Sequence, residues 1–231
     1  MTTIASRWQA VNARIAAAAR SAGRDPASIA LVAVSKTFPP NAIAEAQRAG
    51  QQAFGENYVQ ECLDKIRALH GLDIQWHFLG PIQSNKARLV AENIDWVHGV
   101  DRLKIAERLS AARPDTLPAL QICIQVNVSG EDSKSGATPE AAIALASQIS
   151  ALPRLQLRGL MAIPEPTPDS VQRRSRFRML REIRDEVCRK GIRMDTLSMG
   201  MSDDLEDAIA EGATVVRVGR AIFGERGPGK A

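Results

Sequence analysis

Hydrophobic and polar positions follow two alternating patterns along the chain. Short, largely apolar runs are separated by longer segments whose apolar residues recur every three or four positions. The short runs are typical of strands covered on both faces, and the longer segments are typical of amphipathic helices. The predicted strands span residues 29–35, 52–55, 75–79, 94–99, 119–128, 155–163, 196–199 and 214–218. The predicted helices between them span residues 41–49, 58–69, 86–92, 103–112, 139–149, 171–189 and 203–211.

A further helix precedes the first strand. Its apolar face is formed by Ile4, Trp8, Val11, Ile15 and Ala18, and its arginines lie off that face. Thr2 or Thr3 can cap its beginning, and Gly23 and Pro26 end it. The repeated alternation of strands and helices that follows predicts a parallel sheet.

The length and composition fit one compact α/β domain. The chain has 231 residues, of which 45% are hydrophobic. About eight strand–helix units in a chain of this size favour a single (β/α)8 TIM-type barrel with an extra N-terminal helix. An open doubly wound sheet is the structural alternative. We expect the domain to span residues 1–226 and residues 227–231 (GPGKA) to be a disordered tail.

The charge is basic but mixed. Thirty Lys and Arg face 26 Asp and Glu, giving a formal charge of +4, and aromatic residues make up only 4%. The densest basic segment, residues 173–184, is interrupted or followed at helical spacing by Glu182, Asp185 and Glu186. This pattern favours a solvated helix with ion pairs over a nucleic-acid surface. A barrel that binds nucleic acid is therefore the least favoured of three functional hypotheses.

The cysteines and the apolar runs bear on the compartment. Cys62, Cys123 and Cys188 are scattered, which predicts reduced thiols in a cytoplasmic protein rather than a disulfide framework. The N-terminal segment has no apolar block, and no stretch of about 18 apolar residues occurs. Neither a signal peptide nor a contact with a membrane is therefore expected.

Candidate chemistry is expected where the strands end, because barrels of this type place their active sites there. Lys36 directly follows the first apolar strand. A strand-end lysine is often an ordinary surface residue. At a barrel mouth, however, a partly desolvated lysine has a lowered pKa, and its neutral amine can attack an aldehyde. His77, which lies between apolar neighbours, is equally compatible with a core histidine and a functional one.

The last two strand–helix units contain the features of a phosphate site. The segments Gly200-Met201-Ser202 and Gly219-Arg220 follow strands seven and eight, where barrels of this type commonly bind phosphate. Glycines let backbone N–H groups approach an anion, and Ser202 can either cap its helix or donate to a phosphate oxygen. Glycine turns with an ordinary cap are the alternative. Arg217 either points into the barrel mouth or pairs with a carboxylate outside it.

Several motifs carry a resemblance to a known family. They are LVAVSK (31–36), FGENYVQE (54–61), WHFLGPIQSNK (76–86), VNVSGEDSKSG (126–136), GLMAIP (159–164), LSMGMSDDLEDAI (197–209) and VRVGRAIFGER (216–226). In this order the chain resembles the YggS/PROSC family of proteins that bind pyridoxal 5′-phosphate (PLP). That family is concerned with PLP homeostasis and is related to the barrel domain of alanine racemase.

The resemblance implies a set of cofactor contacts. PLP is expected as a Schiff base on Lys36, with Arg217 at the ring nitrogen. The expected phosphate contacts are Ser202, Gly219 and the backbone of Arg220, whereas the role of the Arg220 side chain stays open. The resemblance also implies that Asn57, His77 and Met199 line the pocket.

Two functions remain for such a site. The favoured one is a non-catalytic protein that holds, buffers or delivers PLP, with apo-PLP enzymes as candidate recipients, acting as a monomer. The alternative is a PLP-dependent amino-acid racemase. Racemisation needs acid–base groups on both faces of the substrate carbanion, and alanine racemase takes one of them, a tyrosine, from an additional domain. This sequence ends after the eighth strand and contains a single tyrosine, Tyr58. The loop 129–136 could fold over the site.

Overall fold

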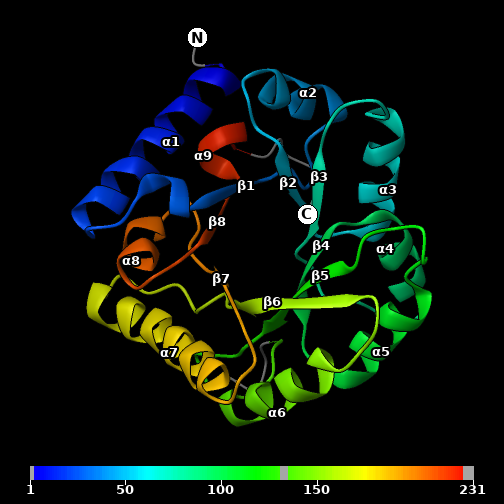
Figure 1. Ribbon diagram of the computed structural model, residues 1–231. Helices are drawn as coiled ribbons and strands as arrows, with labels where there is room; N and C mark the ends of the chain where they lie inside the picture. The colour runs from blue at the N-terminus through cyan, green and yellow to red at the C-terminus, as the bar shows by residue number, and fades with distance from the viewer. Residues whose placement is uncertain (1–2, 131–134, 226–231) are drawn as a thin grey trace.

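The computed structural model describes residues 3–130 and 135–225 and contains a closed barrel of parallel strands (Figure 1). The strands are β1 (Ala30–Val34), β2 (Ala53–Glu56), β3 (Gln75–Phe78), β4 (Trp96–Val100), β5 (Leu120–Gln125), β6 (Leu155–Met161), β7 (Thr196–Ser198) and β8 (Val215–Val218). They follow one another in chain order around the barrel, and β8 closes it by pairing with β1. The (β/α)8 prediction is confirmed, and the open sheet is wrong.

Helices surround the barrel (Figure 1). They are α1 (Ile4–Ser21), α2 (Pro40–Arg48), α3 (Val59–Ala68), α4 (Ala87–Asn93), α5 (Leu103–Ala112), α6 (Pro139–Ser150), α7 (Ser170–Arg189), α8 (Leu205–Ala210) and α9 (Arg220–Phe223), with a 3-10 turn η1 (Pro26–Ser28). The predicted helices are all present, with small shifts at their ends. The short elements η1 and α9 were not predicted, because neither is long enough to show a hydrophobic period.

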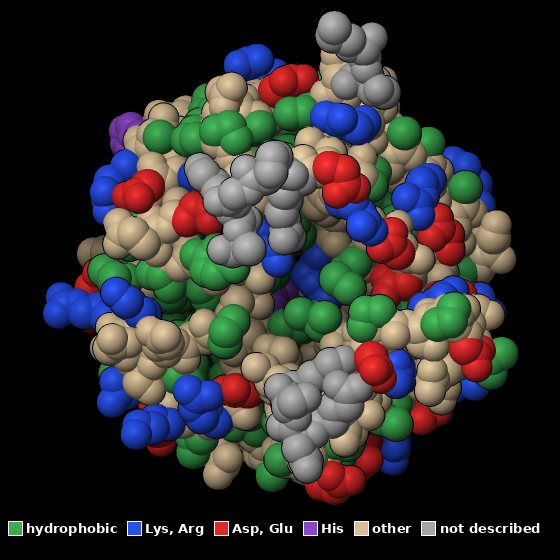
Figure 2. Space-filling view, turned by 180° about the vertical axis from the view of Figure 1, so that it is seen from behind, with side chains coloured by type: hydrophobic (Ala, Val, Ile, Leu, Met, Phe, Trp, Pro, Cys, Tyr) green, Lys and Arg blue, Asp and Glu red, His purple; other side chains and the backbone are tan. Residues whose placement is uncertain are grey.

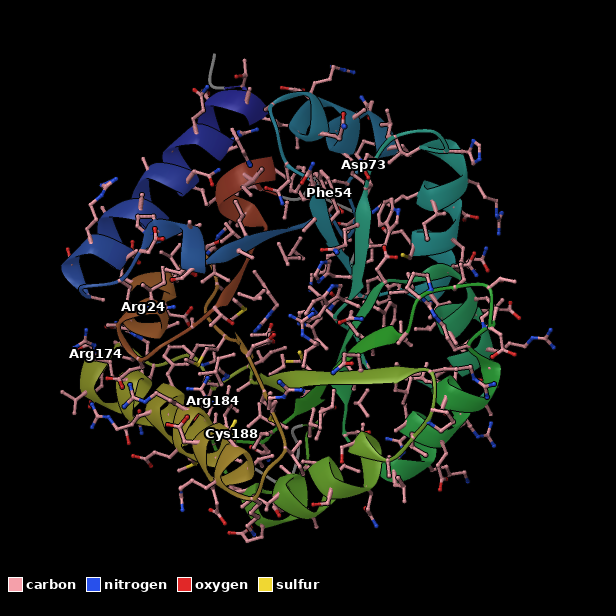
Figure 3. The ribbon with its side chains drawn as sticks, viewed as in Figure 1. Arg24, Phe54, Asp73, Arg174, Arg184 and Cys188 are labelled. Atoms are coloured by element: carbon pink, nitrogen blue, oxygen red, sulfur yellow. The ribbon has the colours of Figure 1, made fainter. Side chains whose placement is uncertain are left out.

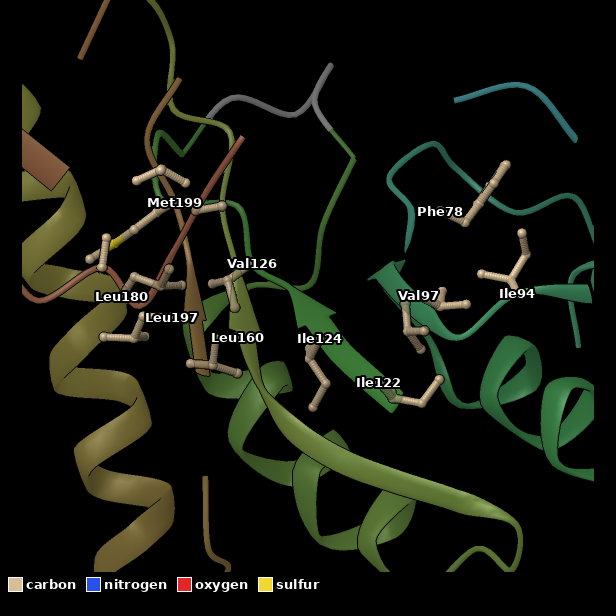
Figure 4. Close-up of a cluster of buried hydrophobic side chains, with 14 of the residues drawn as sticks. Phe78, Ile94, Val97, Ile122, Ile124, Val126, Leu160, Leu180, Leu197 and Met199 are labelled. Carbon is tan, nitrogen blue, oxygen red and sulfur yellow. The ribbon is translucent and has the colours of Figure 1, made fainter. Parts of the chain in front are cut away.

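Two different environments lie on the two sides of the barrel wall. Outward-facing strand residues such as Val97, Ile122 and Leu197 are buried in an apolar layer beneath the helices (Figure 4). The inside also contains polar side chains, including the buried His98 and Arg217. Bulky aliphatic residues dominate the interior of most barrels of this type. This interior is therefore unusually polar.

Helix α1 joins the N-terminal segment to the end of the barrel domain. Thr3 caps it, since the Thr3 hydroxyl accepts a hydrogen bond from the backbone N–H of Ser6 at 3.1 Å. Its contacts reach α2, α8 and α9, beside which it lies in Figure 1. The predicted extra helix is therefore confirmed, with Thr3 as its cap. It packs against helices of both the first and the last strand–helix units of the barrel.

The arginine-rich helix α7 forms ion pairs, but mostly with a neighbouring helix. Arg173 and Arg174 pair with Asp207 of α8 at 2.7 and 3.1 Å. Arg178 pairs with Glu211, the residue that follows α8, at 2.9 Å. Arg174 and Arg184, a second member of this series, are labelled on α7 in Figure 3. The predicted ion pairs are confirmed, whereas the expectation that acids of the same helix supply them was largely wrong.

Several sequence predictions concern compartment and order. The three cysteines are free thiols. No helix within residues 3–130 and 135–225 is long and apolar enough to cross a membrane. The predicted tail, residue 226 at the predicted domain boundary, and the centre of the loop 129–136 lie outside the described residues.

Candidate cofactor-binding site

A cavity of about 430 Å³ opens where β1, β7 and β8 end. Figure 2, which shows the molecule from behind, has a central hollow in which Lys and Arg atoms are visible. The lining residues are Val34, Lys36, Phe38, Met201, Ser202, Asp203, Arg217, Gly219, Arg220, Gly224 and Glu225. The volume lies within the range of about 300–1,000 Å³ that is typical of small-molecule sites. The structure thus brings together five residues that the sequence had indicated separately as candidates: Lys36, Ser202, Arg217, Gly219 and Arg220.

Lys36 lies at the cavity on a tightly constrained backbone. It is half-buried, and the residue before it, Ser35, is fully buried. The next residue, Thr37, has a φ of 70°, in the left-handed region that β-branched residues avoid. The backbone N–H of Thr37 donates to Glu61 Oε1 at 2.6 Å. This bond to a carboxylate holds Thr37 in a conformation that costs roughly 1–3 kcal/mol.

A group of buried charges holds the other side of Lys36. We call Ser35, Glu56, Glu61 and Lys65 the strand-end cluster. Lys65 Nζ donates to the carbonyl oxygen of Ser35 at 2.8 Å. It also pairs with one carboxylate oxygen of Glu56 and one of Glu61, each at 2.7 Å. The Ser35 hydroxyl donates to Glu56 Oε1 at 2.6 Å. The backbone on both sides of Lys36 is therefore fixed by the cluster.

Two of the three charged side chains of the cluster lie almost entirely out of water. The side chains of Lys65 and Glu56 are 4% and 0% exposed. Burial raises the pKa of Glu56, and the neighbouring Lys65 opposes that rise. The second carboxylate oxygen of Glu56, Oε2, is buried without a hydrogen bond among the described residues. Breaking the pair by removing one partner would leave an uncompensated buried charge.

Arg217 enters the cavity from inside the barrel. It is 3% exposed, and its guanidinium donates to Ser198 Oγ at 2.7 Å and to the carbonyl oxygen of Ala162 at 2.8 Å. Burial lowers its pKa to about 10, which still leaves it charged at neutral pH. Of the two orientations that the sequence allowed for Arg217, the structure has the one toward the barrel mouth.

The loop after β7 presents Ser202 to the cavity. Gly200 has a φ of 95°, and a Cβ there would come within 2.6 Å of Ala208 Cβ, so this turn requires glycine. Asp204 Oδ1 accepts a hydrogen bond from the backbone N–H of Met201 at 2.6 Å, which closes the turn. Helix α8 begins at Leu205, with Asp204 at its N-cap position. Of the two roles considered for Ser202, capping this helix is therefore wrong, and the residue lies in the cavity wall.

The loop after β8 packs closely on β1. A Cβ at Gly219 would lie 3.1 Å from the carbonyl oxygen of Val34, which is tighter than ordinary contact. The side chain of Arg220 forms a short ion pair with Asp203 and a longer one, at 3.9 Å, with Glu225. The Arg220 side chain is thus already engaged with carboxylates at the cavity rim.

Three predicted site residues do not line the cavity. Asn57 packs its backbone against Gly80, where an added Cβ would meet the Asn57 oxygen at 2.2 Å. His77 is buried inside the barrel, and burial lowers its pKa to about 3. Met199 is fully buried and lies beside Leu180 of α7 in the outer apolar layer (Figure 4). Direct pocket contacts of Asn57, His77 and Met199 therefore have no support in this geometry.

Two arginines of α1 donate hydrogen bonds to the backbone beside the cavity, and the sequence had not indicated them as site residues. Arg14 donates to the carbonyl oxygen of Ser202 at 3.1 Å. Arg7 donates to the carbonyl oxygen of Ile222 in α9 at 2.7 Å. These arginines are seven positions apart, so the helical period places them on one face of α1. That spacing was visible in the sequence, but the loops that the face would touch were not.

The side chains at the cavity suit one kind of ligand. Lys36 supplies an amine for a carbonyl group, Arg217 a fixed positive donor, and Ser202 a hydroxyl beside two glycine-containing loops. Such a set fits a molecule that carries an aldehyde, an aromatic nitrogen and a phosphate, and PLP carries all three. No cluster of three or more metal-ligating His, Cys, Asp or Glu occurs within residues 3–130 and 135–225.

Comparisons with known proteins agree with this geometry. The family model described as alanine racemase, N-terminal domain, matches residues 7–227. The chain therefore belongs to the family of the alanine racemase N-terminal domain. Within that family, it is 58% identical over 226 residues to the pyridoxal phosphate homeostasis protein of Pseudomonas aeruginosa PAO1, covering 98% of this chain and 97% of the relative.

Two further similarities support the resemblance drawn from the motifs. The pyridoxal phosphate homeostasis protein of Escherichia coli K12 is 52% identical over 234 residues, which cover 98% of each chain. Among solved structures, that of PipY from Synechococcus elongatus PCC7942 with PLP bound has a TM-score of 0.84 and 38% identity. It covers 96% of this chain and 100% of that chain. The predicted family relationship is confirmed.

Proposed function

We propose that this protein binds PLP as a Schiff base on Lys36 and serves intracellular PLP homeostasis by holding, buffering or delivering the cofactor. The observation that carries the proposal is the convergence of Lys36, Arg217 and both glycine loops on one cavity. The similar PipY structure contains PLP, and the relatives named above are called homeostasis proteins.

Each side chain has a role in this proposal. The Lys36 amine bonds to the aldehyde carbon, and Arg217 faces the ring nitrogen. Ser202, Gly219 and the Arg220 backbone N–H hold the phosphate, while Arg7 and Arg14 keep the two loops in place from α1. When bound, PLP would supply an electron sink to any amine that reached it.

The geometry favours a carrier over an enzyme. A permanently charged arginine at the ring nitrogen opposes protonation of that nitrogen, which makes the ring a weaker electron sink. Racemisation also needs a second acid–base group opposite the lysine. Among the described residues lining the cavity, the carboxylates are Asp203 and Glu225, and both lie beside the Arg220 guanidinium. Tyr58 is 54% exposed and does not line the cavity.

The direct test is spectroscopic. PLP added to the protein should give the absorbance band of a protonated imine, and borohydride should abolish that band and fix the pyridoxyl group to the protein. Lys36→Ala should show neither change while retaining the melting temperature of the ligand-free protein, since Lys36 is a half-buried strand-end residue. A Lys36→Ala variant that still acquires the imine band at the same PLP concentration would contradict the proposal.

Solvent deuterium exchange at the α-carbon of alanine separates carrier from racemase. A carrier should give exchange no faster than PLP with a model amine, and it should pass PLP to an apo-PLP enzyme in a mixed incubation. Stereochemical inversion at about 1 per second or faster, a turnover typical of enzymes, would establish the racemase instead.

Compartment and assembly are part of the same proposal. Three free cysteines fit a reducing cytoplasm, and a closed barrel can stand as a monomer. The paired arginines of α7 leave little unpaired positive charge there for nucleic acid. Light scattering of the purified protein with and without PLP gives its molar mass and so tests whether it is a monomer.

A further inference from the structure

A chain of hydrogen bonds crosses the barrel interior and ends on Arg217. Arg217 Nη1 donates to Ser198 Oγ at 2.7 Å, and Ser198 Oγ lies 2.8 Å from His98 Nδ1. His98 Nε2 lies 2.9 Å from His77 Nδ1, and His77 Nε2 lies 2.9 Å from Gln75 Oε1. Strands β4 and β7, which carry His98 and Ser198, are not neighbours in the sheet, so these side chains meet across the interior.

The direction of every bond follows from the two ends of this network. Gln75 Oε1 can only accept, so a neutral His77 carries its proton on Nε2 and accepts at Nδ1 from His98 Nε2–H, which leaves His98 Nδ1 as an acceptor. An arginine has donors and no acceptor, so Ser198 Oγ must accept from it. The single Ser198 proton is then given to His98 Nδ1. His98 Nε2–H donates to His77, and His77 Nε2–H donates to Gln75. Ser198, His98 and His77 thus each accept once and donate once within the network, Arg217 only donates, Gln75 Oε1 only accepts, and both histidines are neutral.

The surroundings keep the chain in this state. Burial lowers the pKa of both His77 and His98, and the charge of Arg217 lowers that of His98 further. The His77 ring stacks on Trp96 with centroids 5.4 Å apart and planes 9° apart. The Arg158 guanidinium lies 4.8 Å from the Trp96 centroid, on the same indole. The His77 end of the hydrogen-bond network is therefore held in place. The order of donors along the network leaves a lone pair of Ser198 Oγ directed at Arg217.

We propose that Ser198, His98 and His77 are positioning residues that hold the Arg217 guanidinium in the orientation needed to face the cofactor ring nitrogen. Two of the five N–H groups of Arg217 are used by Ser198 and Ala162, which fixes the plane of the guanidinium. The inference rests on the proposed binding of PLP with Arg217 at its ring nitrogen. It also gives His77 a role that its place outside the cavity wall would otherwise leave unexplained.

Ser198→Ala removes the first bond of the chain, and two ligands reveal its effect. With PLP, the dissociation constant should rise about tenfold, as for one lost charge-assisted bond, and the absorbance maximum of the bound cofactor should shift. With 1-deaza-PLP, in which carbon replaces the ring nitrogen, the same substitution should leave the dissociation constant unchanged. Ser198→Thr, which keeps the hydroxyl, should restore the wild-type maximum.

Ser110→Ala is the matched control, because Ser110 is also buried and donates its hydroxyl to a carbonyl oxygen, that of Pro153. It should affect neither ligand. If Ser198→Ala does not fold, His98→Gln and His98→Leu replace it, since only glutamine can still accept from Ser198 and donate to His77. Equal losses for PLP and 1-deaza-PLP, or none, would overturn the inference while the Lys36 imine persists. Failure of wild-type protein to form the imine would instead overturn the proposed function.

Discussion

Two buried polar networks support the cavity from opposite sides of the barrel wall. The strand-end cluster lies between β2 and α3 and places two carboxylates around Lys65. The hydrogen-bond network inside the barrel, which links Gln75 to Arg217, runs through two neutral histidines and contains one charge, that of Arg217. The cluster holds a backbone, that of the residues flanking Lys36. The hydrogen-bond network holds a side-chain group, the Arg217 guanidinium.

The difference follows from what each network has to fix. In the proposed function the Lys36 side chain has to meet the aldehyde, and the cluster bonds to the Ser35 carbonyl and the Thr37 N–H, so it fixes the backbone from which that side chain enters the cavity. An arginine that is to face one ring atom, as proposed for Arg217, needs a fixed guanidinium plane, and here the bonds do go to the guanidinium itself. Charge is tolerated in the cluster because opposite charges lie 2.7 Å apart.

The largest effect on stability should come from breaking the strand-end cluster. Lys65→Met leaves Glu56 buried without its counterion and should lower the free energy of unfolding by about 3–5 kcal/mol. Urea denaturation measures this. Lys190→Met is the matched control, since Lys190, at the C-terminal cap of α7, forms an exposed i,i+4 pair with Glu186, and its loss should cost less than about 0.5 kcal/mol. Similar losses for both variants would show that the cluster is no more important than a surface pair.

The interior hydrogen-bond network should instead affect how the free energy of unfolding depends on pH. Burial lowers the pKa of His77 to about 3, whereas an unfolded histidine titrates near 6.5. Its contribution to stability is therefore present above pH 6.5 and is lost as pH falls toward 3. His77→Gln removes that proton uptake, so between these limits the slope of stability against pH should decrease by about 1.4 kcal/mol per pH unit. An unchanged slope in urea titrations at pH 4.5 and 5.5 would contradict a buried neutral His77.

The smallest expected effect is confined to the ligand. Ser202→Ala removes one phosphate donor, which costs roughly 1–3 kcal/mol of binding if the bond is charge-assisted. PLP affinity should fall about tenfold or more, while pyridoxal, which lacks the phosphate, should bind the variant and the wild type alike. Ser150→Ala on the exposed end of α6 serves as a control. Equal losses for both ligands would place the phosphate elsewhere in the cavity.

Much of this arrangement could be predicted from sequence, because it depends on local patterns. The apolar runs gave the strands, and the strand ends located Lys36, Arg217 and the loops at Ser202 and Gly219. Those residues meet because parallel strands in a closed barrel end on the same side. Local pattern and topology together were sufficient for them.

The supporting networks could not be predicted in the same way. His98 and Ser198 are 100 positions apart, and nothing local indicates that their side chains meet across the barrel. Lys65 resembles an ordinary surface residue of α3 until the strand end that it covers is known. Met199 follows the strand that leads to the cavity, but alternation along the strand turns its side chain outward, to α7. Pairing across the fold decides such contacts, and the sequence pattern does not contain it.

The central claim is that Lys36 is the residue that holds PLP. The most direct test is borohydride reduction of the wild-type protein with PLP, followed by peptide mass mapping of the pyridoxyl group. Our account predicts the label on Lys36, with a Lys65→Met variant that still folds labelled there more slowly because its flanking backbone is less fixed. A label found mainly on Lys86 or Lys134, with Lys36 unmodified, would contradict the account.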